Sequence, residues 1–384
     1  MNKGKALIEL FLRHKQNDLQ HRYITNSHIE PLLNNLPGTF KVDQIGSSVE
    51  NRSIYSVKIG HGPKKVLMWS QMHGNESTTT KALFDMFQSI SKGDLNSIID
   101  NFQLLIIPIL NPDGAFAYSR HNANDIDLNR DAINQSEPEM QALMRAYHDF
   151  KPDFCFNLHG QRTIFSAGNY KKPATLSFLA PAQDEACSLT ETRKTAMSII
   201  VAIQGVLQEF IPGQIGIYDD SFNLNCVGDT FQSHNVPTIL FEAGHYENDY
   251  SREEVRKFMY IAILIALFKI EDFELIPGSF EDYTEIPQNQ KLFNDIVLRD
   301  ARLEENGDLF DIVFQYEEVL RNNFVQFIPI IEKIKSSTTQ FGHNDIDCKG
   351  KLVVGTNKEK LHTGYQEKAV YLNNELFSLI PDKS

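Results

Sequence analysis

The sequence MHGNE at residues 72–76 decides the fold that we expect for this chain. It follows an apolar run at residues 66–70, typical of a buried strand, and precedes residues 77–87, whose apolar positions recur at helical spacing. His73 and Glu76 therefore lie three positions apart at the start of a helix, where their side chains can converge on one point. An imidazole and a carboxylate that meet there suit a divalent metal ion, with zinc as the first candidate. Because His-x-x-Glu also occurs by chance, it needs further ligands and a base to support it.

Composition and charge limit the classes of protein that the chain can belong to. It has 384 residues, 41% of them hydrophobic and 26 of them Phe, which predicts a globular protein of two or three domains with a large core. The formal net charge of −13 argues against non-specific binding to nucleic acid, because phosphate contacts need clustered Lys and Arg.

Cysteine spacing and apolar runs predict neither a disulfide framework nor a membrane span. The four cysteines, Cys155, Cys187, Cys226 and Cys348, are scattered without a Cys-x-x-Cys pair, so we expect small buried side chains rather than a thiolate zinc site. The N-terminal segment has the charge pattern of an amphipathic helix rather than of a signal peptide. The longest apolar run, residues 258–268, is shorter than the roughly 20 residues that span a bilayer. We therefore expect a cytoplasmic protein without membrane contacts.

Strand and helix signals alternate through most of the chain. Buried strands are expected at 66–70, 102–110, 153–158 and 236–241, a hairpin at 40–62, a turn at 111–114, and helices at 137–150, 182–210 and 251–270. This alternation predicts an α/β fold with a mixed, mostly parallel sheet covered by helices on both faces. Such sheets bind ligands beyond the carboxyl ends of their strands, where His73, His159 and Glu242 all fall.

The alternation of strands and helices stops after Pro277. Short alternating runs follow at 309–316, 324–331, 351–354 and 369–372, and they predict strands without intervening helices. We therefore expect a catalytic domain at residues 1–284 and a smaller, β-rich C-terminal domain at residues 285–384.

The segment RHNANDIDLNRD at residues 120–131 groups polar side chains that can bind an anion. Arg130 and Asn129 offer several donors, and a guanidinium fork matches a carboxylate in two parallel hydrogen bonds. Standing alone, this segment is more typical of a solvated loop of mixed charge, and the other motifs give it its weight. Glu242 ends an apolar strand, and because burial of an unpaired carboxylate there would be costly, its position favours a function. His159 also ends a strand, where a single histidine is more often structural than a ligand.

These motifs together make the chain resemble the zinc carboxypeptidase family, the relatives of carboxypeptidase A. The matching elements, in family order, are GSSVENRSI at residues 46–54, HGNE at 73–76, NPDG at 111–114, RHNANDIDLNRD at 120–131, the His of NLHG and the Glu of FEAG. They extend from about residue 46 to residue 244, and their joint occurrence by chance is improbable.

The resemblance implies one zinc ion per chain, held by His73, Glu76 and His159. Asp127 matches the acid that orients the first histidine ligand through a hydrogen bond. The sequence departs from many relatives at Asn157, where they carry Asp, so the resemblance implies less negative charge behind the third ligand.

The resemblance also assigns the residues that face the substrate. Glu242 matches the general base, and Arg120 matches the arginine that stabilises the oxyanion. Asn129 and Arg130 match the pair that binds the terminal carboxylate of the substrate. Tyr218 is the best match to the family's mobile tyrosine, which precedes the base in the sequence.

The function implied is that of a zinc metallocarboxypeptidase, a hydrolase that cuts the C-terminal amide bond of a peptide with a metal-activated water. An alternative is a zinc-dependent deacylase of N-acyl amino acids, similar to aspartoacylase and succinylglutamate desuccinylase, which use a similar residue set. A C-terminal domain that narrows the cleft favours the deacylase, whereas the motifs at residues 46–54 and 111–114 favour the peptidase. Either substrate carries a free carboxylate. A metal-free binding module is less favoured, because every chemical position is filled.

Overall fold

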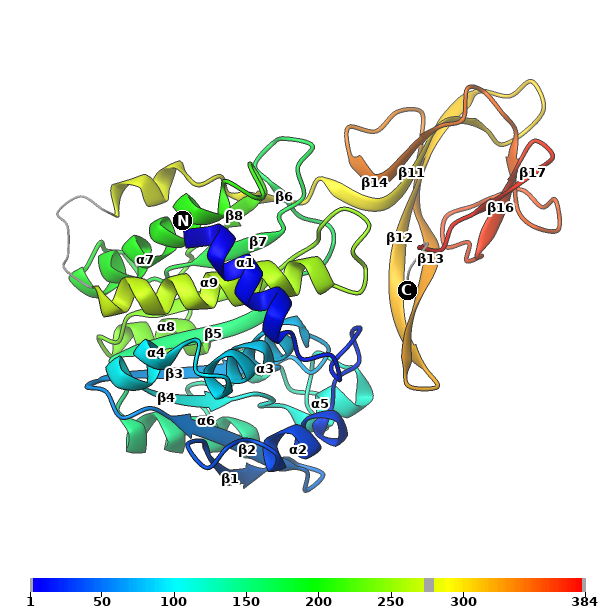
Figure 1. Cartoon of the computed structure of the whole chain (residues 1–384). Helices are drawn as coiled ribbons and strands as arrows, with labels where there is room; N and C mark the ends of the chain where they lie inside the picture. Colours follow the sequence, from blue (N-terminus) through cyan, green and yellow to red (C-terminus); the bar gives the residue numbers. More distant parts are fainter. Residues whose placement is uncertain (1–2, 273–279, 382–384) are drawn as a thin grey trace.

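The central feature of the computed structural model, which describes residues 3–272 and 280–381, is a sheet of eight strands (Figure 1). The strand order is β1-β2-β4-β3-β5-β9-β7-β8. The strands are β1 (Lys41–Ser47), β2 (Ser53–Ile59), β3 (Lys64–Ser70), β4 (Phe102–Ile107), β5 (Phe154–Gly160), β7 (Leu176–Leu179), β8 (Ile215–Ile217) and β9 (Thr238–Ala243).

Parallel pairing dominates this sheet. β3 pairs in parallel with β4 and β5, β5 with β9, and β7 with β8, whereas β1 with β2, β2 with β4 and β7 with β9 are antiparallel. The mixed, mostly parallel sheet predicted from the sequence is therefore confirmed. Because β3, β5 and β9 are parallel neighbours, their carboxyl ends lie at one edge of the sheet.

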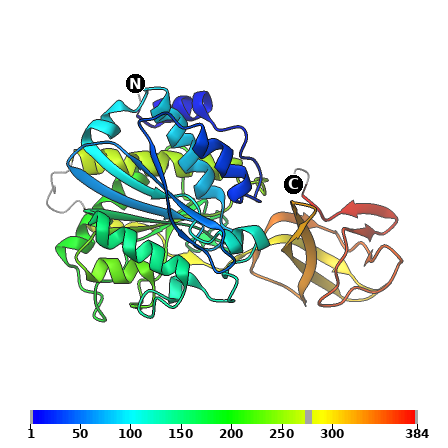
Figure 2. The same ribbon diagram turned by 90° about the horizontal axis from the view of Figure 1, so that it is seen from below.

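Helices cover both faces of the sheet, as Figure 2 shows. Side chains alternate along β3, so that Val66 and Met68 face one hydrophobic core while Leu67 and Trp69 face another. The helices that contribute to the first core include α1 (Lys3–His14), α3 (Thr78–Ser91), α7 (Glu191–Leu207) and α9 (Glu253–Glu271). Those that contribute to the second include α6 (Pro138–Phe150) and α8 (Val227–Ser233). The predicted cover on both faces is confirmed.

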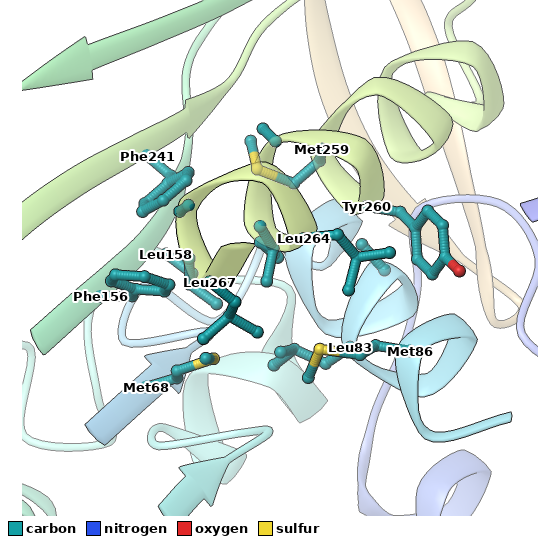
Figure 3. Packing of buried hydrophobic residues seen from close by; sticks show 14 of the residues in the cluster. Met68, Leu83, Met86, Phe156, Leu158, Phe241, Met259, Tyr260, Leu264 and Leu267 are labelled. Carbon is teal, nitrogen blue, oxygen red and sulfur yellow. The ribbon is translucent and has the colours of Figure 1, made fainter. Parts of the chain in front are cut away.

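The larger core joins α3 and α9 to the middle of the sheet. Figure 3 shows Met68, Phe156 and Phe241 of the strands packed against Leu83 of α3 and Leu264 of α9, and all five side chains are buried. Complete burial of a Leu, Met or Phe side chain stabilises a fold by roughly 1.5–3 kcal/mol. This layer therefore fixes the strands whose ends carry the candidate site.

Two local predictions are wrong. The turn expected at residues 111–114 is the start of a short helix, α5 (Pro112–Ala117), because the Asn111 side chain caps it. The helix expected at residues 182–210 begins only at Glu191, the first residue of α7. The residues before it are held in a turn by side-chain hydrogen bonds, which compete with helix formation.

A smaller, β-rich region follows the large sheet in the sequence, and it lies to one side of that sheet in Figures 1 and 2. Four strands form a sheet in the order β13-β12-β11-β14, and three form a second one in the order β15-β16-β17. These strands share a hydrophobic core of their own. They are β11 (Phe293–Arg302), β12 (Leu309–Arg321), β13 (Phe324–Lys335), β14 (Phe341–Asp347), β15 (Val353–Val354), β16 (Ala369–Leu372) and β17 (Glu375–Ser378).

The strand pairing bears on where one region ends and the next begins. Strand β10 (Asn289–Gln290) still pairs with β6 (Ser166–Ala167), which belongs to the first region. The division at residue 285 stays a prediction, and this pairing favours a boundary a few residues later. The remaining described helical elements are α2 (Asn26–Asn34), α4 (Asn96–Asn101), η1 (Leu128–Arg130) and η2 (Glu281–Glu285).

The cysteines and the helix lengths bear on two further predictions. All four cysteines are free; Cys155 and Cys348 are buried as expected, whereas Cys187 and Cys226 are only partly buried. Within residues 3–272 and 280–381, no helix combines the length and apolar character needed to cross a bilayer.

Candidate active site

The loop after β3 is held by close contact with the start of α5. A Cβ atom added to Gly74 would lie 1.9 Å from the carbonyl carbon of Gly114, and one added to Gly114 would lie 2.6 Å from His121 O, so both positions require glycine. The Asn111 side chain accepts a hydrogen bond from Gly114 N at 2.8 Å and donates one to Met72 O at 3.2 Å. The HGNE and NPDG motifs therefore support each other directly.

Asp113 ties the hairpin between β1 and β2 to the same loop. Its carboxylate accepts hydrogen bonds from Ser48 Oγ at 2.6 Å, Glu50 N at 2.8 Å and Arg52 Nη1 at 2.6 Å. The motif at residues 46–54 thus braces the candidate site from outside and does not line it.

Three predicted metal ligands converge at the carboxyl ends of β3 and β5. His73 Nδ1 lies 3.0 Å from Glu76 Oε1, His159 Nδ1 lies 3.0 Å from Glu76 Oε2, and the two Nδ1 atoms are 3.1 Å apart. Possible ligand atoms of all three residues lie within 4.8 Å of one another. Glu76 is held further by Gly160 N, which donates to Oε2 at 2.9 Å.

Asp127 determines which nitrogen of His73 faces the other ligands. Its Oδ1 lies 3.0 Å from His73 Nε2 and accepts a hydrogen bond from it, so Nδ1 is the ring nitrogen that faces Glu76 and that would bind a metal ion after losing its proton. Two imidazole nitrogens and a carboxylate facing one another at about 3 Å leave a cluster of lone pairs that a cation satisfies. This donor set fits zinc.

The charged groups of this cluster shift one another's pKa values. Burial lowers the pKa of His73, but Glu76 and Asp127 raise it more, to about 9. Burial raises the pKa of Glu76, yet His73 and His159 reverse this effect and hold it well below its usual range. Glu76 therefore stays ionised next to the positive charge of its neighbours.

Glu242 lies next to the third ligand, as the sequence predicts. In the parallel pair of β5 and β9, Glu242 is the register partner of His159. Its Oε2 is buried and has no hydrogen-bond partner in the described part of the chain. Burial, followed by repulsion from Glu76, raises the pKa of Glu242 well above its usual range. A cation held by the ligands would oppose both effects and favour a carboxylate that can accept a proton.

Arg120 reaches the site from the polar segment at residues 120–131. Its Nε and Nη2 donate to Asp127 Oδ2 at 3.1 and 3.0 Å, and its Nη1 lies 3.6 Å from Glu76 Oε1. The guanidinium is therefore positioned beside the metal ligands, with Nη1 nearest to them.

Asn129 and Arg130, which we call the carboxylate pair, both lie in η1. Asn129 Oδ1 accepts a hydrogen bond from Val227 N at 3.0 Å, which fixes its amide. Arg130 Nη1 donates to Asn129 O at 2.6 Å and lies 3.2 Å from Cys226 Sγ. Its Nε and Nη2 form no hydrogen bond among the residues that the structure describes, and Arg130 is exposed. They can receive a carboxylate.

Tyr218 directly follows β8 and faces the site. Its hydroxyl donates to Gln161 Oε1 at 2.5 Å. Burial and the charge of Glu242 raise the pKa of Tyr218, which keeps the phenol protonated. Every residue singled out from the sequence therefore lies in or beside one cluster, whereas the chemical role of each remains a prediction.

Sequence reasoning missed several residues of this region. Gln161 lies between Tyr218 and the ligands, Asn75 lies within the HGNE motif, and Arg252 comes from the residue before α9. Of these, Asn75 alone carried a signal, since it stands between the two proposed ligands. On the ligand side, His159 Nε2 and both amide atoms of Asn157 are buried without partners among the described residues, and nothing in the structure accounts for this.

Comparisons with known proteins point in one direction. The family model described as zinc carboxypeptidase matches residues 25–235. Human carboxypeptidase N catalytic chain is 25% identical over 205 residues, covering 40% of this chain and 43% of the relative. Carboxypeptidase SOL1 of Arabidopsis thaliana is 27% identical over 168 residues, covering 37% and 34%. The matched segment thus spans less than half the length of these curated relatives.

A solved structure gives the same fold. The metallo-carboxypeptidase from Burkholderia cenocepacia superposes with a TM-score of 0.51 at 19% sequence identity, covering 64% of this chain and 70% of that chain. At this level of identity the likeness concerns the fold alone.

Proposed function

The chain belongs to the zinc carboxypeptidase family, and from this premise we propose that it removes the C-terminal residue of peptides with one zinc ion per chain as its cofactor. The relatives that it matches are named as carboxypeptidases, which favours peptides over N-acyl amino acids as substrates. Its substrate therefore carries a free terminal carboxylate.

One observation carries this proposal. Lone pairs of His73, Glu76 and His159 converge on one point, and a second, unpaired carboxylate lies beside them at Glu242. A buried carboxylate without a partner is costly unless it serves a ligand or a reaction. A cation site next to such a group suits hydrolysis of an amide by water.

The residues of this chain would divide the reaction among them. His73, Glu76 and His159 would hold the zinc ion, which would supply a water of lowered pKa and polarise the carbonyl group of the substrate. Glu242 accepts a proton from the attacking water and passes it to the departing amine. Arg120 stabilises the negative charge that develops on the carbonyl oxygen. Arg130 holds the terminal carboxylate and so determines that the last amide bond is cut.

Metal analysis of purified variants tests the proposed ligands without depending on activity. We expect about one zinc per chain in the wild type and a sharp loss of zinc in His73→Ala and His159→Ala, because each removes one of three ligands. His61→Ala is the matched control, since His61 is exposed and outside the site. Full zinc retention in both ligand variants would contradict the assignment.

We also propose a cytoplasmic location without membrane contacts, which the four free cysteines favour, because proteins of oxidising compartments more often pair theirs in disulfides. Fractionation of cells that express the protein would test it, and recovery with the membranes would contradict it.

A further inference from the structure

A cavity of about 350 Å³ adjoins the metal ligands on the side of Arg120. Its walls come from Glu76 and Arg120, from residues 160–163 after β5, and from residues 315–318 of β12 in the C-terminal region. Neither member of the carboxylate pair lines it. If the carboxylate pair binds the C-terminal residue of a peptide, the residues before the scissile bond, on its acyl side, extend toward this cavity.

One cation in the wall, Arg252, has no acidic partner. Its side chain is buried, with the residue only 2% exposed, and its guanidinium donates to the carbonyl oxygens of Ala243 and Gln161, the latter at 2.7 Å. No carboxylate lies within ion-pair distance among residues 3–272 and 280–381, and its Nε has no hydrogen-bond partner there. Burial and the nearby Arg22 lower the pKa of Arg252 to about 10.

The backbone of Arg252 is also unusual. Its φ of 60° lies in the left-handed region, which non-glycine residues adopt less often, although other residues of this chain such as Gln71 and Tyr118 adopt it too. The cavity wall thus contains a buried guanidinium with no carboxylate at ion-pair distance among the described residues, although the charges of Glu318 and Asp249 act on it from farther away. Such a group can bind an anion.

Arg22, in the wall of the same cavity, differs from Arg252 because its guanidinium is paired with a carboxylate. Its Nη2 donates to both carboxylate oxygens of Glu318, at 3.1 and 2.9 Å, and Tyr118 OH donates to Glu318 at 2.5 Å. Glu318 belongs to β12, so this pair attaches the C-terminal region to the catalytic body and closes the cavity on that side. Figure 1 shows β12 on the side of the C-terminal region that faces the large sheet. Arg22 is therefore a structural cation.

Two further groups in the wall lack partners. Arg162 is exposed and forms no hydrogen bond or ion pair within the described ranges, and Asn75 Oδ1 is a buried acceptor without a donor. The wall also contains the carboxylate of Glu317, which is exposed and so is screened by solvent. The wall thus offers two guanidinium groups, which suit a carboxylate, and one amide oxygen, which suits an N–H donor.

We infer that this cavity binds a carboxylate on the acyl side of the scissile bond, so that preferred substrates are short peptides with an acidic residue immediately before the C-terminal residue. Arg252 and Arg162 would bind that side chain, and Asn75 would accept a hydrogen bond from the peptide N–H. The volume lies at the lower end of the range of small-ligand pockets, roughly 300–1,000 Å³, which favours short substrates. The inference rests on the proposed carboxypeptidase function.

The experiment compares two isosteric substrates, acetyl-Glu-X and acetyl-Gln-X, with the same C-terminal residue X and a free terminal carboxylate. For zinc-loaded wild type we expect a preference for the Glu peptide on the order of tenfold or more in kcat/KM, mostly through KM, because a charge-assisted hydrogen bond is lost with Gln. Arg162→Gln should reduce this preference several-fold. Arg252→Lys, which retains the charge but loses the Nε donor, should reduce it partially. Arg321→Gln, at an exposed position away from the cavity, should leave both rates unchanged.

Calorimetric binding of the same peptides to Glu242→Gln protein gives a readout that does not need turnover. Tighter binding of the Glu peptide, weakened by Arg162→Gln, supports the inference even if neither peptide is cut, and absence of cleavage then counts against the proposed function alone. Equal kcat/KM values together with equal affinities in the wild-type cavity would overturn the inference. A preference that survives unchanged in both Arg162→Gln and Arg252→Lys would also overturn it.

Discussion

The two sides of the candidate site differ in how their charged groups are paired. Those of the ligand side pair with one another, although His159 Nε2 and the Asn157 amide there lack partners among the described residues, whereas the substrate side holds unpaired charged groups. On the ligand side, both ring nitrogens of His73 have partners, and Asp127 joins His73 to Arg120. On the substrate side, Glu242 Oε2 and Arg252 Nε are buried without partners among the described residues. Because native proteins pair nearly all buried polar groups, the unpaired atoms indicate where a substrate completes the structure. The paired side fixes geometry, and the unpaired side receives the ligand.

The largest effect should come from the unpaired carboxylate. Glu242→Gln keeps the shape of the side chain but cannot accept a proton, so we expect turnover to fall on the order of 10²–10⁴-fold with zinc content unchanged. Steady-state kinetics and metal analysis of the same preparation measure both quantities. Glu247→Gln, at an exposed glutamate, is the matched control and should retain full activity. Unchanged turnover in Glu242→Gln would remove Glu242 from the role of base.

The next largest effect should come from the carboxylate pair. Arg130→Ala should lower kcat/KM on free-acid peptides by on the order of 10²-fold, because a charge-assisted pair loses one partner. Arg130→Lys should recover only part of this loss, since an ammonium group lacks the planar fork. Equal recovery by Lys and Arg would show that charge alone, and not the fork, binds the substrate.

The paired side predicts a smaller effect, on metal affinity instead of chemistry. Asp127→Asn removes the carboxylate that accepts a hydrogen bond from His73 Nε2, so zinc affinity should weaken by roughly 10–100-fold. Competition with a chelator of known affinity measures the change. Asp125→Asn is the control, because Asp125 lies in the same segment with an exposed side chain. Unaltered affinity in Asp127→Asn would mean that His73 is oriented by other contacts.

The smallest expected effect concerns a carboxylate that is buried and paired. Asp295 of β11 accepts hydrogen bonds from Tyr250 OH at 2.9 Å and Tyr316 N at 2.7 Å, yet burial raises its pKa to about 6. The folded state thus retains a proton that the unfolded state releases, so the free energy of unfolding should fall as pH rises from about 4 to 6. Chemical denaturation across this range should show a shallower pH dependence in Asp295→Asn than in the wild type. Asp308→Asn, at an exposed position, should leave the slope unchanged.

Much of the ligand side could be predicted from the sequence, because its signals are local. His73 and Glu76 are three residues apart on one turn, and His159 and Glu242 each end an apolar strand. Parallel pairing of β3, β5 and β9 then brings these strand ends together. Alternation of apolar strands and amphipathic helices was likewise sufficient to predict the covered sheet.

The substrate side could not be predicted in the same way, because its partners are distant in the sequence. Arg252 carries no motif, and only the fold places it beside residues 160–163 and across from β12. The error at residues 111–114 has a related cause: Asn-Pro-Asp-Gly is compatible with both a turn and a capped helix, and here the Asn111 side chain, which also donates to Met72 O in the distant HGNE loop, caps the helix. Single-residue signals do not report such contacts.

The central claim is that this chain is a zinc-dependent enzyme that removes one residue from a free C-terminus. The most direct measurement is mass spectrometry of the products formed by zinc-loaded wild type from matched peptides with a free-acid or an amidated C-terminus. The account predicts loss of the single C-terminal residue from the free acids and hydrolysis of the amides slower by two or more orders of magnitude, since the amides leave the Arg130 guanidinium unmatched. Cleavage of internal bonds, or equal cleavage of acids and amides, would contradict it.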